Sequence, residues 1–152
     1  MGFGRIAEQR VVAAMLSEVW MPHYRALLAT SLEIAGQVGE AASLLQEALD
    51  NAARTGERWF EAELNRHQGE LMLRQGQSGR AEELFRGALR IAQDQRAKLW
   101  ELRAAVSLAR MWRDQGRHSD ASAILAPVYG WFTEGLDTPD LKQAKALLDE
   151  GA

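Results

Sequence analysis

The stretch GQSGRAEELF, residues 76–85, contains the residue types of one kind of phosphate-binding turn. Two glycines three residues apart precede a segment expected to be helical, and the N–H groups of a helix N-terminus can hold a phosphate. A P-loop, however, needs a strand before its glycines and a Lys-Ser/Thr pair after them. This stretch continues instead with Arg80 and Ala81, and then with Glu82 and Glu83, whose carboxylates would repel an anion. We therefore interpret the two glycines as a turn between helices.

The residues that carry catalytic or metal chemistry in other proteins form no site in this sequence. Cysteine is absent, so disulfides, thiolate ligands and cysteine nucleophiles are excluded. His67 and Glu70 share a helical face, but their spacing is more typical of a solvated pair than of a metal site. Ser119 lies between His118 and Asp120, yet a catalytic triad is defined by geometry rather than by neighbours in sequence. We interpret Ser119 as a helix cap and predict no enzyme activity, catalytic residue, metal or cofactor.

Composition indicates a globular chain without an obvious pull toward nucleic acid or membrane. The 152 residues suffice for one domain with a core, and the net charge of -3 gives no overall attraction to polyanions. Acidic residues interrupt every basic run, which argues against DNA or RNA binding. No apolar run approaches the roughly 20 residues of a membrane span, and the start lacks the apolar core of a signal peptide. We expect a cytoplasmic protein with neither nucleic-acid nor membrane partners.

A period of 40 residues organises the chain. GQSGRAEELFRGAL at 76–89 aligns without gaps to GQVGEAASLLQEAL at 36–49, with seven of fourteen positions identical. A further step of 40 reaches GRHSDASAILAPVY at 116–129, which is more diverged. Such self-similarity is the signature of a repeat architecture in which each unit buries its apolar face against its neighbours.

Each unit is predicted to be a pair of helices joined by the glycine turn. After the turn, apolar residues follow the i, i+3, i+4, i+7 spacing of a buried stripe. Small residues that would permit close helix crossing recur at fixed places, namely Ala29, Gly69 and Ala109 in the first helices and Ala41, Ala81 and Ala121 in the second. Gly56 fits a helix C-cap, whereas the corresponding Arg96 indicates a turn built differently. Residues 4–19 predict a leading amphipathic helix, and Thr138-Pro139-Asp140 predicts the start of a closing helix.

These units resemble tetratricopeptide repeats (TPRs). The small-aromatic-small spacing of that family is matched by Ala81, Phe85 and Ala88, although the repeat has 40 residues rather than the usual 34. The resemblance implies an all-α, right-handed α-α superhelix of about three helix pairs, with a leading helix and a C-terminal capping helix. The repeats would cover approximately residues 20–56, 57–96 and 97–133, with the closing helix at 138–150, in a single domain of residues 1–152.

A narrower resemblance concerns TGERWFEAELNRHQGELMLRQG and YGWFTEGLDTPDLKQAKALLDE. Both stretches are similar to the C-terminal helical-repeat region of large bacterial signalling proteins. In those proteins a nucleotide cyclase or transcription-regulator module is joined to a regulatory ATPase and then to such repeats. The resemblance implies that a partner could be another part of a parent signalling protein.

The TPR resemblance also implies where a partner would bind, because the first helices of the pairs line the concave groove of that fold. The groove-directed positions would be Arg66, Glu70 and Arg74 in the second unit and Arg103, Ser107 and Arg110 in the third. Arg103 and Arg110 share a helical face and could clamp a carboxylate or an acidic peptide by bidentate hydrogen bonds. The alternative is a solvated face in which glutamates neutralise the arginines, the candidates being Glu61, Glu63, Glu70 and Glu101.

The sequence thus predicts a non-catalytic protein–protein interaction or regulatory scaffold module that binds a protein or peptide segment, possibly acidic, in the groove. Two alternatives remain. The leading helix could leave an apolar edge that pairs two copies in a homodimer, or the groove could sense a small ligand or short peptide. Most of the five tryptophans are expected to pack in the core, and Trp131 or Phe132 is the candidate exception.

Overall fold

The computed structural model describes residues 36–56, 58 and 60–151, and every regular element among them is an α-helix. The prediction of an all-α fold is confirmed. The predicted leading helix (4–19) and Ala29 lie outside the described residues. The chain divides into two units, Met1–Phe60 and Glu61–Ala152, which are described separately. The assignment of residues 1–152 to a single domain stays a prediction.

The described part of the first unit contains helix α2 (Val38–Thr55). Its buried residues recur every three or four positions, at Ala41, Leu45, Ala48 and Ala52, as an amphipathic helix requires. The helix ends at Gly56, which adopts a left-handed conformation with φ 74° and donates its N–H to the carbonyl of Ala52. The predicted glycine C-cap is therefore confirmed.

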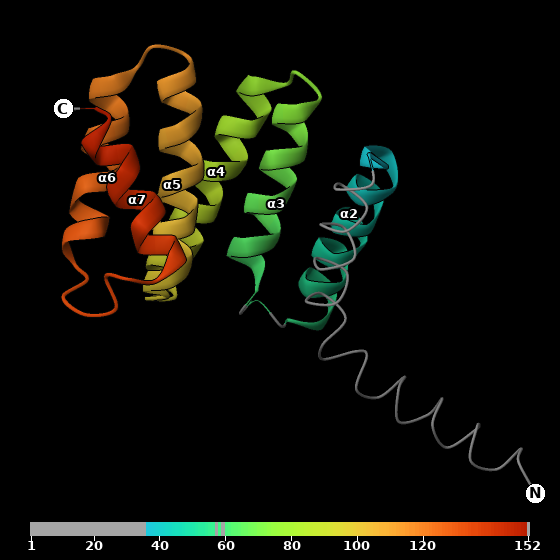
Figure 1. Ribbon diagram of the computed structural model, residues 1–152. Coiled ribbons are helices and arrows are strands. Elements are labelled where there is room, and N and C mark those ends of the chain that lie inside the picture. Colours follow the sequence, from blue (N-terminus) through green and yellow to red (C-terminus); the bar gives the residue numbers. More distant parts are fainter. Residues whose placement is uncertain (1–35, 57, 59, 152) are drawn as a thin grey trace, which may run out of the picture. The chain divides into compact units, whose positions relative to one another are not determined.

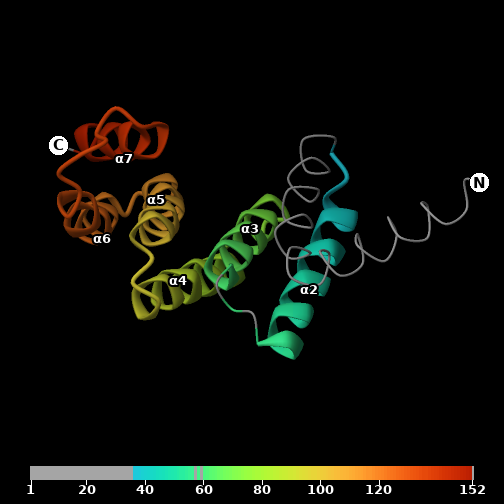
Figure 2. The ribbon, with the colours of Figure 1, turned by 90° about the horizontal axis from the view of Figure 1, so that it is seen from below.

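The second unit consists of five helices, each of which packs against the next one in the chain. They are α3 (Glu61–Arg74), α4 (Ser78–Asp94), α5 (Lys98–Asp114), α6 (His118–Gly130) and α7 (Pro139–Asp149). Helices α3 and α4 form one hairpin and α5 and α6 the next, while α7 packs against both α5 and α6 (Figure 1). Figure 2 shows that α3, α5 and α7 follow one another along one face of this unit, with α4 and α6 behind them. None of the described helices is long and apolar enough to cross a membrane.

The core of the second unit is a row of large apolar side chains between small ones. Ala81, Phe85 and Ala88 of α4 are fully buried, so the small-aromatic-small spacing faces the core. Gly69 of α3 crosses α4 directly over Phe85, because a Cβ at Gly69 would lie 2.6 Å from Phe85 Cε1. The predicted role of Gly69 as a small residue at a close helix crossing is confirmed.

The three turns that connect α3 to α4, α4 to α5 and α5 to α6 share one backbone geometry. Gly76 and Gly116 have φ of 75° and 78°, and the residue after each donates its N–H to a carbonyl near the end of the preceding helix. Arg96 adopts the same left-handed region at φ 54°, and Ala97 N–H bonds the Ala92 carbonyl at 2.9 Å. The expectation of a different turn at Arg96 was therefore wrong, because the hydrogen bonds impose the same geometry without a glycine.

The start of α6 corrects one further interpretation. Arg117 occupies the N-cap and α6 begins at His118, so Ser119 lies within the first turn and does not cap the helix.

Arg96→Gly is expected to stabilise the protein. A non-glycine residue in the left-handed region costs roughly 1–2 kcal/mol, partly offset by the larger unfolded-state entropy of glycine, so the net gain should be about 0.5–1 kcal/mol. Gly116→Ala should lower stability by about 1 kcal/mol through the backbone alone, because nothing lies within 4 Å of a Cβ there. Urea unfolding of both variants checks the pair, and a loss of stability in Arg96→Gly would contradict the shared turn geometry.

Gly69→Ala should destabilise the protein although alanine favours helices. The added methyl would overlap the fully buried Phe85 ring, and such overpacking should leave a net loss of about 1–2 kcal/mol. Gly87→Ala is the matched control, because this α4 glycine has open space around its Cβ and should gain up to about 1 kcal/mol. Thermal unfolding compares the two variants, and equal stabilisation by both would show that the helix crossing tolerates a side chain.

Candidate functional site

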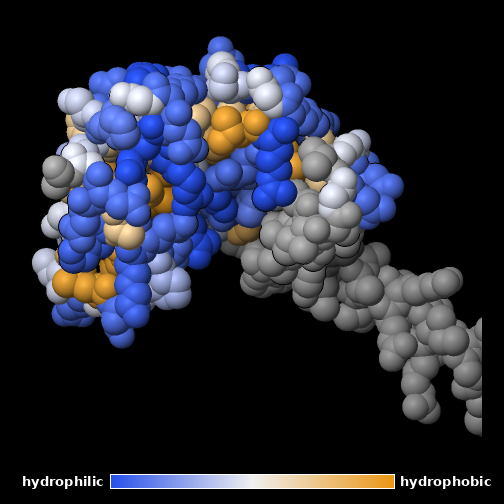
Figure 3. Space-filling view, turned by 45° about the horizontal axis from the view of Figure 1, so that its top comes forward, coloured by the Kyte–Doolittle hydropathy of each residue, from blue (hydrophilic) through white to orange (hydrophobic). Residues whose placement is uncertain are grey.

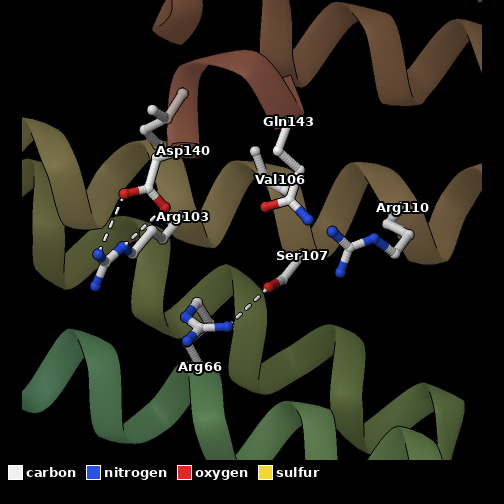
Figure 4. Close-up of a pocket in the computed structure, with 8 residues that line it drawn as sticks. Arg66, Arg103, Val106, Ser107, Arg110, Asp140 and Gln143 are labelled. Carbon is white, nitrogen blue, oxygen red and sulfur yellow. Dashed lines mark hydrogen bonds and ion pairs between the residues drawn. The ribbon is translucent and has the colours of Figure 1, made fainter. Parts of the chain in front are cut away.

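A pocket of about 220 Å³ lies on the face formed by α3, α5 and α7 of the second unit. Arg66 comes from α3, Arg103, Ser107 and Arg110 come from α5, and α7 contributes Asp140 and Gln143 (Figure 4). Leu102 and Val106 complete the lining. The 40-residue period explains this arrangement, because the first helix of each repeat lies on the same face of the array.

Arg66 is held by a bidentate ion pair within α3. Its Nε and Nη2 donate to the two carboxylate oxygens of Glu63 at 2.9 and 2.7 Å. Both side chains are largely buried, with exposed fractions of 17% for Arg66 and 5% for Glu63. His67 Nε2 also approaches Glu63 Oε1, at 3.4 Å, so His67 contacts Glu63 rather than only facing Glu70. The pair therefore fixes the Arg66 guanidinium at the floor of the pocket.

Burial and charge act in opposite directions on this ion pair. Burial by itself would raise the pKa of Glu63, but hydrogen bonds from His67 and Arg66 and their charges hold this pKa far below its usual range. Burial would likewise lower the pKa of Arg66, whereas Glu63, Glu70 and Asp140 raise it above its usual value. Both groups are thus charged near neutral pH, and each compensates the desolvation of the other.

Helix α7 is fastened to α5 by ion pairs at both of its ends. Arg103 Nε and Nη2 donate to the two carboxylate oxygens of Asp140 at 3.1 and 3.2 Å. At the far end of α7, Arg113 Nη1 bonds Glu150 Oε2 at 2.7 Å. Thr138 occupies the N-cap and Pro139 opens α7, as predicted, although no side chain caps the helix. Asp140 therefore binds Arg103 of the neighbouring helix and also places a negative charge in the first turn of α7.

Ser107 and Glu70 connect α5 to α3 beside the Arg66 pair. Ser107 Oγ donates to Glu70 Oε1 at 2.7 Å and accepts from Arg66 Nη1 at 3.4 Å. Ser107 is only 4% exposed, so it forms part of the pocket wall rather than an open surface. Its hydroxyl bonds both neighbours and lets the half-buried Glu70 carboxylate and the Arg66 guanidinium lie side by side.

Arg110 differs from the other arginines of the pocket. Within the described part of the chain it forms no ion pair or hydrogen bond, and it is half-buried. Its guanidinium and the Gln143 amide face the same space at one end of the pocket (Figure 4). The pocket thus combines two neutralised arginines with one that still has its full hydrogen-bonding capacity.

The structure brings together five of the six residues predicted from the sequence. Arg66, Arg103, Ser107 and Arg110 line the pocket, and Glu70 supports Ser107 from behind. Arg74 is exposed at the end of α3 and does not line it. The salt-bridged alternative holds for Arg66, which pairs with the predicted partners Glu63 and Glu70. It also holds for Arg103, which lies 3.5 Å from Glu63 and binds Asp140, a partner that the sequence did not suggest.

The sequence reasoning missed the contribution of α7, Asp140 and Gln143. The signal that could have found it is the period itself, because residues 63, 103 and 143 are each 40 apart, as are 100 and 140. Helix α7 thus occupies the place of a further first helix beside α5. Among the described residues no cluster of three or more metal-ligating side chains occurs.

The opposite face of the unit carries a larger groove of about 460 Å³. Its apolar floor is formed by Leu89, Leu108 and Ile124, and Arg86 and Arg90 of α4 stand at its edge. Arg86 is engaged, because it pairs with Glu82 at 2.8 Å and lies over the Trp112 ring. This groove contains none of the residues singled out from the sequence as groove-directed.

Comparison with known proteins defines the class of fold. The arrangement of helix hairpins is that of a TPR-like helical repeat. A chain described as a kinesin light chain of Podosopora anserina with nearly identical TPR-like repeats matches with a TM-score of 0.65 and 21% sequence identity. The match covers 86% of this chain and 64% of that chain, so this chain spans less than two thirds of its length. No family model and no curated protein sequence matches the chain.

Glu63→Gln should lower the free energy of unfolding at neutral pH. It should also make that free energy depend less on pH in the acid range. The amide removes the bidentate partner of the buried Arg66 guanidinium and leaves it only the longer contact with Glu70 at 3.5 Å, which should cost about 3 kcal/mol at pH 7. Because the folded pKa of Glu63 lies below its ordinary value of 4.5, the unfolded chain binds protons more readily. The wild-type contribution is therefore complete above that value and is lost progressively as the pH falls below about 5.

Urea unfolding between neutral and acid pH measures this contribution. Glu83→Gln is the matched control, because Glu83 is exposed on α4 and its loss should change stability by less than about 0.5 kcal/mol. An unaltered acid slope in Glu63→Gln would refute the stabilising role of the buried pair.

Proposed function

We propose that this chain is a non-catalytic protein–protein interaction module that binds an acidic segment of a partner protein at the α3–α5–α7 pocket. The observation that carries the proposal is Arg110, a half-buried arginine beside Gln143 whose guanidinium engages no other described residue. The helical-repeat fold supports a scaffold of this kind, because its units pack only on their neighbours and leave extended surfaces for partners.

The charges of the pocket favour one carboxylate over a polyanion. Arg66 is balanced by Glu63 and Arg103 by Asp140, so these arginines attract no further charge at full strength. Arg110 can receive a carboxylate in a bidentate geometry, and the Gln143 amide can donate a further hydrogen bond. An aspartate or glutamate side chain of an extended or helical partner segment is the occupant that this arrangement matches.

The size of the pocket bears on the small-ligand alternative. Sites that enclose a small molecule usually measure about 300–1,000 Å³, whereas this pocket has about 220 Å³. It fits a side chain of a partner better than a whole ligand. The homodimer alternative was based on the predicted leading helix, which lies outside the described residues.

The resemblance to bacterial signalling proteins supplies a setting for the proposal. The partner segment would belong to the same signalling system, either elsewhere in a parent polypeptide or in a separate cytoplasmic protein. In that role the module would relay a binding event rather than perform chemistry.

Arg110→Glu is expected to weaken binding of an acidic peptide by about tenfold or more, because an attractive ion pair becomes a repulsive one. The probe is a fluorescein-labelled peptide with alternating leucine and glutamate positions, followed by fluorescence anisotropy. A glutamine-for-glutamate version of the peptide should bind weakly to the wild type. Charge reversal at Arg66 is unsuitable as the test, because it would place two carboxylates together in a buried site.

Arg90→Glu is the matched control for this experiment. Arg90 is exposed on α4 at the edge of the opposite groove, so its reversal changes net charge equally without altering the pocket. Both variants should unfold within about 0.5 kcal/mol of the wild type. Equal peptide affinity of Arg110→Glu and wild type would refute the proposed binding mode.

A further inference from the structure

Three large apolar side chains are exposed in the described part of the chain, and all three lie at one end of the second unit. Leu99 of the first turn of α5 is 44% exposed, Trp131 directly after α6 is 57% exposed, and Leu136 in the loop to α7 is 48% exposed. We call these three residues the end patch. Figure 3 shows apolar surface at this end of the unit, over the loop that joins α6 to α7.

In this patch, side chains at the start of α5 contact side chains that directly follow α6. Lys98 Nζ lies over the Trp131 ring, 5.4 Å from its centroid, and Phe132 meets Trp131 edge-on at 5.2 Å. Lys98 itself is held by Glu101 Oε2 at 2.8 Å. The end patch is separate from the α3–α5–α7 pocket, since none of its residues lines that pocket.

Trp112 shows what a structural tryptophan looks like in this fold. It is 5% exposed and lies between the guanidinium groups of Arg86 and Arg117, at 5.0 and 4.4 Å from its ring centroid. Trp131 also has a cation on its ring, but more than half of its surface is open. Exposed apolar side chains that lie close together typically mark a surface that a partner covers in a complex.

The loop of the end patch is acidic, whereas two basic residues lie on its α5 side, namely Lys98, which pairs with Glu101, and the exposed Arg96. The loop of residues 131–138 contains Glu134 and Asp137 and no basic residue. Both acids are exposed, and neither forms an ion pair with another described residue. At the α4–α5 turn the exposed Asp94 and Arg96 add one charge of each sign, so the acidic character of the patch comes from Glu134 and Asp137.

We propose that the end patch docks a basic amphipathic segment of a partner protein. Leucine-like side chains of that segment would cover Leu99 and Leu136, and a lysine or arginine would lie on the open part of the Trp131 ring, near Glu134 and Asp137. A cation on a tryptophan face beside carboxylates is favoured by both the ring quadrupole and the charges. This occupant is independent of the acidic segment proposed for the α3–α5–α7 pocket.

The same charges disfavour the other possible occupants. Two copies of the chain that met through their end patches would bring Glu134 and Asp137 of each copy together, and like charges at an interface oppose association. An anionic membrane would be repelled by the same carboxylates, although tryptophan and leucine are common in membrane-binding surfaces.

The test is the binding of two labelled helical peptides to the full chain, measured by fluorescence anisotropy. One peptide has leucines at i, i+3, i+4 and i+7 with lysine and arginine elsewhere, and the other has glutamate in place of every basic residue. We expect the basic peptide to bind at least about tenfold more tightly. The double variant Glu134→Lys/Asp137→Lys should reduce that affinity by about tenfold, and so should Trp131→Ser/Leu136→Ser.

The control variant is Glu83→Lys/Asp114→Lys, which makes the same change in net charge at exposed acids away from the patch. It should retain most of the affinity, and Arg110→Glu should retain all of it, which separates this proposal from the function proposed above. The variant Glu134→Lys/Asp137→Lys alters only exposed loop residues, and its fold should be unchanged by circular dichroism. It therefore keeps the proposal testable even if the apolar variant Trp131→Ser/Leu136→Ser unfolds.

Three results would overturn the proposal. The first is equal binding of the basic and acidic peptides, or an equal loss of affinity in the control variant. The second is sedimentation of the wild type as a dimer that Trp131→Ser/Leu136→Ser abolishes, which would make a second copy the occupant. The third is cosedimentation of the wild type, but not of that variant, with phosphatidylserine vesicles, which would make a membrane the occupant.

Discussion

The buried carboxylate of Glu63 is the interaction on which the functional face of the second unit depends. It holds Arg66 in bidentate geometry and lies 3.5 Å from Arg103, which in turn binds Asp140. One group on α3 thereby orders a charged side chain on α5 and, through it, the start of α7. Because a buried charge without a partner is far more costly than a paired one, the three helices are constrained to meet in this register.

This use of charge separates structural arginines from available ones. Arg66 and Arg103 align helices, and their capacity to bind a partner is reduced by the carboxylates that neutralise them. Arg110 has the same residue type and lies two turns along α5 from Arg103, yet no described carboxylate reaches it. An arginine-rich face is thus not uniformly a binding face. The pairing pattern, rather than the number of arginines, determines where a partner can bind.

The second unit presents two surfaces of opposite character. The α3–α5–α7 pocket offers Arg110, which engages no other described residue, whereas the end patch offers apolar side chains beside acids that form no ion pair among the described residues. These surfaces come from different parts of the same helices, since α5 contributes Leu99 at its start and Arg110 near its end. A helical-repeat unit can in this way contact two chemically different segments, because each helix has both a face and an end that neighbouring helices do not cover.

The sequence by itself determined the repeat and the all-α fold, because apolar period, glycine turns and small residues at helix crossings act locally and recur every 40 residues. The resemblance to TPRs added four of the eight residues that line the pocket, namely Arg66, Arg103, Ser107 and Arg110. The small residue at the helix crossing, Gly69, and the glycine cap at Gly56 followed directly from those patterns. Tertiary structure alone decided which pocket arginine has no partner among the described residues, since Asp140 reaches Arg103 across 37 positions of sequence. It also decided the left-handed turn at Arg96, because hydrogen bonding and packing of whole helices override the preference of a single residue.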